Sequence, residues 1–126
     1  MASANVEVAR RFLETAEAQD VEAFRELIGA DAELHHPMGL LRGQDEAAEW
    51  VAKPRENLLP HVVVEEWLEN GDQVVALARL EFHWREEGGL ADEATGASLW
   101  TIRDGRVLRW QPFTDRAEAL RAAGLD

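Results

Sequence analysis

Residues 31–39, with the sequence DAELHHPMG, alternate between polar and apolar side chains. This period of two predicts a strand over residues 32–37 with one buried face, and His36 lies on that face with the apolar residues. Pro37 restricts the residue before it to extended conformations and ends the strand. The pattern therefore predicts a titratable ring at the inner end of a strand, next to a loop that opens into a helix.

The inward direction of His36 has two interpretations. A histidine inside a protein core is commonly satisfied by one hydrogen bond and serves only packing. A histidine at the edge of a pocket instead suits proton transfer, because its unperturbed pKa lies near neutrality. The residue pattern by itself leaves both open.

The composition of the whole chain limits the classes of function. A length of 126 residues predicts one domain, residues 1–126, with its own core. The net charge of −12 repels phosphate groups, so we expect neither nucleic acid nor membrane as partner. With no cysteine there is no disulfide, thiolate metal site or cysteine nucleophile. The first residues do not have the pattern of a signal peptide, and we expect a cytoplasmic location.

Two helices are predicted before the strand. Residues 6–18 repeat apolar side chains at helical spacing, with Asn5 as candidate N-cap. Asp20 is placed to cap a shorter helix over residues 21–28, which Gly29 ends.

After the strand the chain is predicted to form a loop and a third helix. The loop covers Gly39 to Gly43, and the helix runs from Gln44 to about Lys53. Acidic residues in its first turn complement the helix dipole, and Pro54 ends or bends it.

The rest of the chain has the period of an antiparallel meander. Its turns are Asn70-Gly71, residues 86–89 and Asp104-Gly105, which favour tight hairpins. The predicted strands are residues 61–69, 73–85, 91–103 and 106–113. Asp115 and Glu118 have the spacing of a capping box for a final short helix.

This order of elements predicts an α+β fold, because helices gathered on one face of an antiparallel sheet can bury it. We expect a cone-shaped curved antiparallel sheet, a cystatin-like α+β barrel, packed against three N-terminal and central helices around an apolar throat. By periodicity, four tryptophans point inward: Trp50, Trp84, Trp100 and Trp110. They serve either as core or as walls of the throat.

The opposite face of the sheet is predicted to be polar. Arg79, Glu81 and His83 form a row on it, and Trp67 is expected nearby. An indole beside paired charges indicates an interface, although a solvated face with a scattered tryptophan gives the same pattern. His35 and His36 are adjacent on a strand and therefore face opposite sides, so we expect no metal site.

Several segments of the chain match the pattern of a known group of proteins. They are VARRF (8–12), DVEAF (20–24), HPMG (36–39), RGQDEA (42–47), WTIRDGRV (100–107) and DRAEALRAAGL (115–125). With these segments the chain resembles the nuclear-transport-factor-two-like superfamily, most closely SnoaL-like polyketide cyclases and ketosteroid isomerases. The resemblance covers nearly the whole chain and implies the fold more strongly than the chemistry, since the superfamily has many activities.

The resemblance also implies roles for individual residues. The catalytic base of ketosteroid isomerases lies in an Asp-Pro-x-Gly stretch that matches residues 36–39, which places His36 at the base position. The tyrosine donor of that family falls at Phe12, and its protonated acid falls at Ser98; this chain has no tyrosine. Ser98 either donates to a ligand carbonyl or bonds to backbone. An indole N–H is a candidate replacement for the missing tyrosine.

We expect, from the resemblance, a small-molecule enzyme of the isomerase or cyclase-lyase type, without a cofactor. His36 as general base and Ser98 would act on an apolar, carbonyl-bearing substrate, bound by Phe12, Met38 and the four inward tryptophans. The family further implies a homodimer through the outer sheet face. Two alternatives remain open: a non-catalytic binding domain that uses the same throat, and a dimeric protein-interaction module whose throat is filled. The Asp-Arg-Asp arrangement of limonene-type epoxide hydrolases has no clear inward match.

Overall fold

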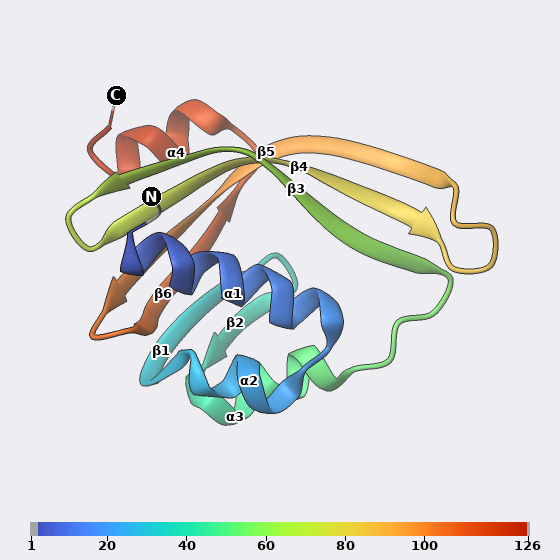
Figure 1. The fold of residues 1–126 in the computed structure, drawn as a ribbon, viewed down its shortest axis with the longest axis horizontal. Coiled ribbons are helices and arrows are strands. Elements are labelled where there is room, and N and C mark those ends of the chain that lie inside the picture. The colour runs from blue at the N-terminus through green and yellow to red at the C-terminus, as the bar shows by residue number, and fades with distance from the viewer. Residues whose placement is uncertain (1–2, 126) are drawn as a thin grey trace.

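The computed structural model describes residues 3–125, which form an α+β fold with a curved, open six-stranded sheet (Figure 1). The helices are α1 (Ala4–Ala18), α2 (Val21–Glu26), α3 (Gly43–Ala52) and α4 (Arg116–Ala122). The strands are β1 (Ile28–His36), β2 (Gly39–Arg42), β3 (Leu58–Asn70), β4 (Gln73–Trp84), β5 (Leu90–Arg103) and β6 (Arg106–Phe113). The predicted fold class is therefore confirmed.

The sheet has the strand order β2-β1-β6-β5-β4-β3. Strands β3 to β6 form the predicted antiparallel meander, and β1 pairs antiparallel with β2. One pair, β1 with β6, is parallel, so the sheet is mixed rather than purely antiparallel. Helices α1, α2 and α3 lie on its concave side, and α4 packs against the opposite side (Figure 1).

Three local predictions were wrong. Residues 39–42 are not a loop, because Gly39 takes a positive φ of 145° and lets the chain turn back along β1 as β2. Ser3 rather than Asn5 caps α1, since its side chain accepts a hydrogen bond from the Val6 N–H at 3.1 Å. Helix α2 ends at Glu26, because Ile28 already pairs with β6.

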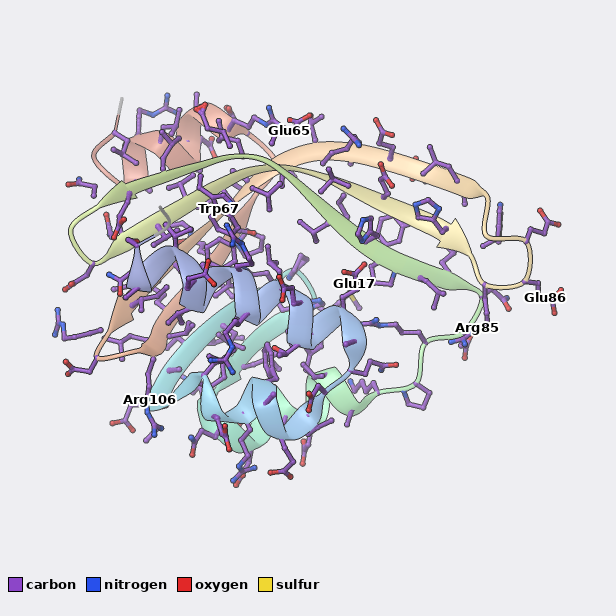
Figure 2. All side chains as sticks on the ribbon, in the orientation of Figure 1. Glu17, Glu65, Trp67, Arg85, Glu86 and Arg106 are labelled. Atoms are coloured by element: carbon purple, nitrogen blue, oxygen red, sulfur yellow. The ribbon has the colours of Figure 1, made fainter. Side chains whose placement is uncertain are left out.

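A bulge in β3 reverses the direction of Trp67. The register between β3 and β4 shifts between Val64 and Glu66, so Glu65 has no partner across the ladder. Trp67 therefore lies on the concave side, where its ring contacts Trp100 with centroids 5.9 Å apart. Figure 2 shows Trp67 on the α1 side of β3 and Glu65 toward α4. The prediction that Trp67 faces outward was wrong because strict alternation does not survive the extra residue.

A second bulge has the same effect on β6. The register with β5 passes from Ile102–Val107 to Thr101–Arg109, so Leu108 is the extra residue. As a result Val107 is buried, while Leu108, which strict alternation would place on the same side as the inward Trp110, is exposed.

The sheet buries apolar side chains on both faces. The main core lies between α1, α2, α3 and the concave face; its largest fully buried residues include Trp100, Phe12 and Phe24. A smaller cluster lies under α4 and contains Val75, Leu99 and Ala119. No helix within residues 3–125 has the length and apolar character needed to cross a membrane.

Trp100 is expected to carry a large share of the stability. Its ring is fully buried and meets Phe12 edge-on at 5.7 Å, so Trp100→Ala leaves a cavity and costs about 3–5 kcal/mol of the free energy of unfolding. Trp84 is 44% exposed, and Trp84→Ala is the matched control, with an expected loss below about 1 kcal/mol. Urea denaturation measures both, and equal losses would contradict this description of the core.

Candidate functional site

An open cavity of about 1220 Å³ lies between the C-terminal half of α1, the β1–β2 hairpin, α3 and the concave face of the sheet. Its lining residues on these strands come from the halves of β4 and β5 that lie toward the turn joining them. Its sheet wall is apolar, with Val62, Ala78, Leu80, Phe82 and Pro112 among its residues. A space of this size is ample for a small organic molecule.

His36 lies on the wall of this cavity, at the last position of β1, as its period-two pattern predicts. Its ring packs 5.1 Å from Trp50 and 6.4 Å from Trp110, measured between ring centroids. His35, the next residue back, is not part of the wall; its Nε2 lies 3.6 Å from a carboxylate oxygen of Glu33.

One hydrogen bond determines which nitrogen of His36 carries the proton. The backbone N–H of Met38 donates to Nδ1 of His36 at 3.1 Å. Because Nδ1 accepts, the neutral ring has its proton on Nε2 and offers an N–H donor from its other end. A general base would instead need a free lone pair on the ring nitrogen that faces the ligand. The resting geometry thus favours His36 as a hydrogen-bond donor. Its role as a base stays a prediction, and it requires the hydrogen bond from the Met38 N–H to break.

The surroundings keep His36 neutral. Burial of the ring, and second the positive charge of Lys53, lower the pKa of His36 below its ordinary value of 6.5. At neutral pH the ring is therefore uncharged, which suits contact with an apolar ligand.

Aromatic rings form the deep part of the wall. Trp50 and Trp110 stack with centroids 5.6 Å apart, and Phe12 lies 5.3 Å from Trp110. These three predicted binding residues all line the cavity. The Nε1–H of Trp110 is buried and has no acceptor within residues 3–125, so it is an unused donor next to the cavity.

Two other tryptophans do not reach the cavity. Trp100 is 0% exposed and packs in the core, because its place in β5 is directly under α1. Trp84 ends β4 beyond the helices and is exposed. Both were predicted as binding residues, because periodicity predicts which side of the sheet a side chain is on. It does not predict whether a helix, a cavity or solvent lies over that side chain.

Met38 and Ser98 both border the cavity. Met38 is 89% exposed and belongs to the mouth rather than the wall. Ser98 lies on β5 between Ala76 and Pro112 of the neighbouring strands and is partly buried. Ser98 is on the sheet wall and His36 on the β1 wall, so the structure brings both residues to one space.

Sequence reasoning missed some cavity residues. Leu40 and Leu41 border the cavity from β2. This segment was predicted as a loop, for which the residue pattern gives no inward or outward face. Lys53 borders it from the end of α3 and was treated only as a helix terminus. The sequence did single out Lys53 in one respect, because it is the only lysine in the chain.

The remaining histidines are engaged outside this cavity. His61 pairs with Glu17 of α1, and His83 bonds through Nε2 to Glu81 at 2.8 Å and through Nδ1 to the Gly88 carbonyl at 3.1 Å. They border a smaller hollow of about 330 Å³ next to Arg85, which Figure 2 places at the start of the β4–β5 turn. In residues 3–125 no three His, Asp or Glu side chains are grouped to hold a metal ion.

The two environments predict opposite titrations. The hydrogen bond to Glu81, and second that to Gly88, raise the pKa of His83 above 6.5, whereas the pKa of His36 lies below 6.5. The stabilisation linked to His36 is present above pH 6.5 and is lost as pH falls through its lowered pKa. The stabilisation linked to His83 is present below pH 6.5 and is lost as pH rises through its raised pKa. Histidine NMR titration measures both, with H36Q and H83Q for assignment; the reverse order would contradict this site.

Three solved structures show how this architecture compares. A protein assigned as a SnoaL-like polyketide cyclase from Jannaschia sp. CCS1 has 26% identity and a TM-score of 0.71, covering 98% of this chain and 93% of its own. A Mycobacterium tuberculosis epoxide hydrolase of the LEH-like type has 15% identity and a TM-score of 0.75, with coverages of 95% and 89%. A protein with a ketosteroid isomerase-like fold from Catenulispora acidiphila, solved with trimethylamine, has 20% identity and a TM-score of 0.72, with coverages of 95% and 94%.

No curated protein sequence matches the chain. The family model of the SnoaL-like domain matches residues 9–110, which include most of α1, His36, α3 and the strands up to Trp110. The match extends over most of the chain and agrees with the fold of the three structures, and the protein belongs to the SnoaL-like domain family.

Proposed function

We propose that the chain is a small-molecule enzyme of SnoaL-like type whose cavity binds an apolar compound with a carbonyl group. The observation that carries the proposal is the neutral His36 ring, held by the Met38 N–H and packed on Trp50. Its Nε2–H is available to donate a hydrogen bond to the carbonyl oxygen. This hydrogen bond polarises the C=O bond of the ligand, which makes the carbonyl carbon more electrophilic and the adjacent C–H groups more acidic.

A neutral imidazole suits this role. Triosephosphate isomerase uses a neutral histidine to polarise a carbonyl, kept uncharged by its surroundings. Here burial and Lys53 lower the pKa of His36 and so keep its ring neutral. Ser98 and the indole N–H of Trp110 border the same space as second donors, although Trp110 must shift to expose its buried nitrogen.

The apolar wall supports a ligand that is mostly hydrocarbon. Phe12, Trp50 and Trp110 give large, rigid contact surfaces, and the wall on β4 consists of Ala78, Leu80 and Phe82. The rival function is a non-catalytic binding domain in the same cavity. It is favoured by the phenylalanine at the position of the family's tyrosine donor, since Phe12 has no polar atom to offer.

Hydrogen exchange at a carbon next to a carbonyl tests the chemistry without a known substrate. We expect the protein to accelerate the exchange of the α-hydrogens of 2-tetralone in D₂O, followed by NMR. H36F removes the donor but keeps a ring, and should lose about tenfold in rate, the value of one hydrogen bond of about 1.4 kcal/mol. H36Q keeps an N–H donor and should retain part of the acceleration.

The same assay separates the competing roles. Equal loss in H36F and H36Q, with a rate that falls as pH drops below 6.5, would show that His36 is a base and not a donor. Binding of 2-tetralone without acceleration would support the non-catalytic domain. H35Q, on the other side of the same strand, is the matched control and should behave as the unaltered protein.

We also propose a homodimer through the outer sheet face. Arg79 lies on that face and pairs with Glu65, Glu81 and Glu93 from three strands. Side chains of this row are partly buried in the single chain, and a sheet-to-sheet contact would cover them further. Trp67 is not part of this surface, so the proposal rests on the charged row and Val63.

Light scattering during gel filtration tests the dimer. We expect twice the 14.1 kDa mass of one chain. V63E adds a charge next to Arg79 on the outer face and should shift the mass toward the monomer. L58E places the same charge at an exposed residue of β3 that pairs with Trp84, on the other side of the sheet from His83, and should not. A monomer in the unaltered protein would refute the proposal.

A further inference from the structure

Lys53 is the only lysine of a chain with 25 acidic residues, and it borders the cavity. It follows the last turn of α3, and its backbone N–H donates to the carbonyl of Trp50 at 3.4 Å. Trp50 is also the residue on which the His36 ring packs. The lysine is therefore next to the part of the cavity that holds the candidate functional group.

The backbone of Lys53 is fixed. The Gln19 side chain donates to the carbonyl of Lys53 at 2.7 Å and to the carbonyl of Val51 at 3.0 Å, which joins α3 to the end of α1. Pro54 follows and limits the extended conformation further. The side chain thus starts from a defined position at the rim of the cavity.

The ammonium group of Lys53 is not used by the protein. Every ion pair within residues 3–125 has arginine or histidine as its cation. The other cation of the cavity wall, Arg55, is occupied, because it donates to the carbonyls of Glu17 and Ala16 at 2.6 Å each. Within residues 3–125, neither cation of the cavity wall forms an ion pair, but Lys53 alone has no hydrogen-bond partner for its charged group.

No acidic residue of the rim forms an ion pair with Lys53 within residues 3–125. Glu17 is paired with His61, and Glu46 accepts the backbone N–H of Arg42 at 3.0 Å. Glu49, one helical turn before Lys53, is exposed and forms no ion pair with it. Lys53 and His36 border the same cavity, and the nearby Lys53 charge contributes, after burial, to lowering the pKa of His36.

We propose that Lys53 binds a carboxylate of the ligand at the mouth of the cavity, while the apolar body of the ligand lies against Trp50, Trp110 and Phe12. The ligand class is then an amphipathic carbonyl compound with one carboxylate. The proposal rests on the proposed function, because it assigns a ligand to the same cavity. It explains why a strongly acidic chain keeps one unpaired ammonium at this rim.

Two fluorescent probes that differ in one group test the proposal. Pyrenebutyrate carries a carboxylate, and pyrenebutanol replaces it with a neutral hydroxyl. Both quench tryptophan fluorescence when bound near Trp50 and Trp110, which gives Kd for each. The unaltered protein should bind pyrenebutyrate about fivefold more tightly at low salt, the size expected of a partly exposed ion pair. K53Q should reduce this preference to about one and leave pyrenebutanol binding unchanged.

A matched control separates a local contact from net charge. R106Q removes one positive charge at the β5–β6 turn, which Figure 2 places at the other end of the molecule from Arg85. It should keep the fivefold preference. Equal preference in K53Q and the unaltered protein, or equal loss in R106Q, overturns the role of Lys53 while binding of pyrenebutanol keeps the cavity as a ligand site. Failure of both probes to bind the unaltered protein overturns the ligand site and this proposal together.

Discussion

The guanidinium of Arg116 holds together the three longest strands at the point where the sheet bends. It donates to the Gly96 carbonyl of β5 at 3.0 Å and to the Ala78 carbonyl of β4 at 2.9 Å, and it pairs with Glu65 at the bulge of β3. At Gly96 any side chain would clash, since a Cβ there would lie 2.5 Å from the Phe113 carbonyl oxygen. Backbone carbonyls need hydrogen-bond donors, and this one side chain donates to a carbonyl on each of two neighbouring strands. Figure 1 shows the strands twisting at this place.

The bend divides the concave face into two parts with different uses. Before it, Val74 and Ala76 of β4 pack with Trp100 under α1 and form solid core. Beyond it, Leu80 and Phe82 face the open cavity. A straight sheet would press against α1 along its whole length, whereas the bent one diverges from the helix and leaves room for a ligand. The same bend therefore accounts for both the packed core under α1 and the open cavity beyond it.

The sequence predicted the elements well because alternation and helical spacing are local, and most of these strands keep them. His36 lies on the expected side of its strand. Trp67 and Leu108 do not, because each follows or occupies a bulge, and an extra residue in one strand depends on pairing with the next strand. Whether Trp84 and Trp100 are buried depends on how far α1 extends along the sheet. The residue pattern of a single strand does not contain this information.

The role of His36 shows why family membership does not decide the chemistry. The resemblance places it where related enzymes have a base, yet the turn after β1 directs the Met38 N–H at Nδ1 and so puts the proton on the other nitrogen. The imidazole N–H and the Lys53 ammonium are then open donors of the cavity wall. Of its carboxylates, Glu17 and Glu46 are engaged, whereas Glu49 has no partner within residues 3–125. Donors of this kind are complementary to a ligand with acceptor oxygens. The apolar wall and the polar rim of the cavity are thus both complementary to an amphipathic ligand.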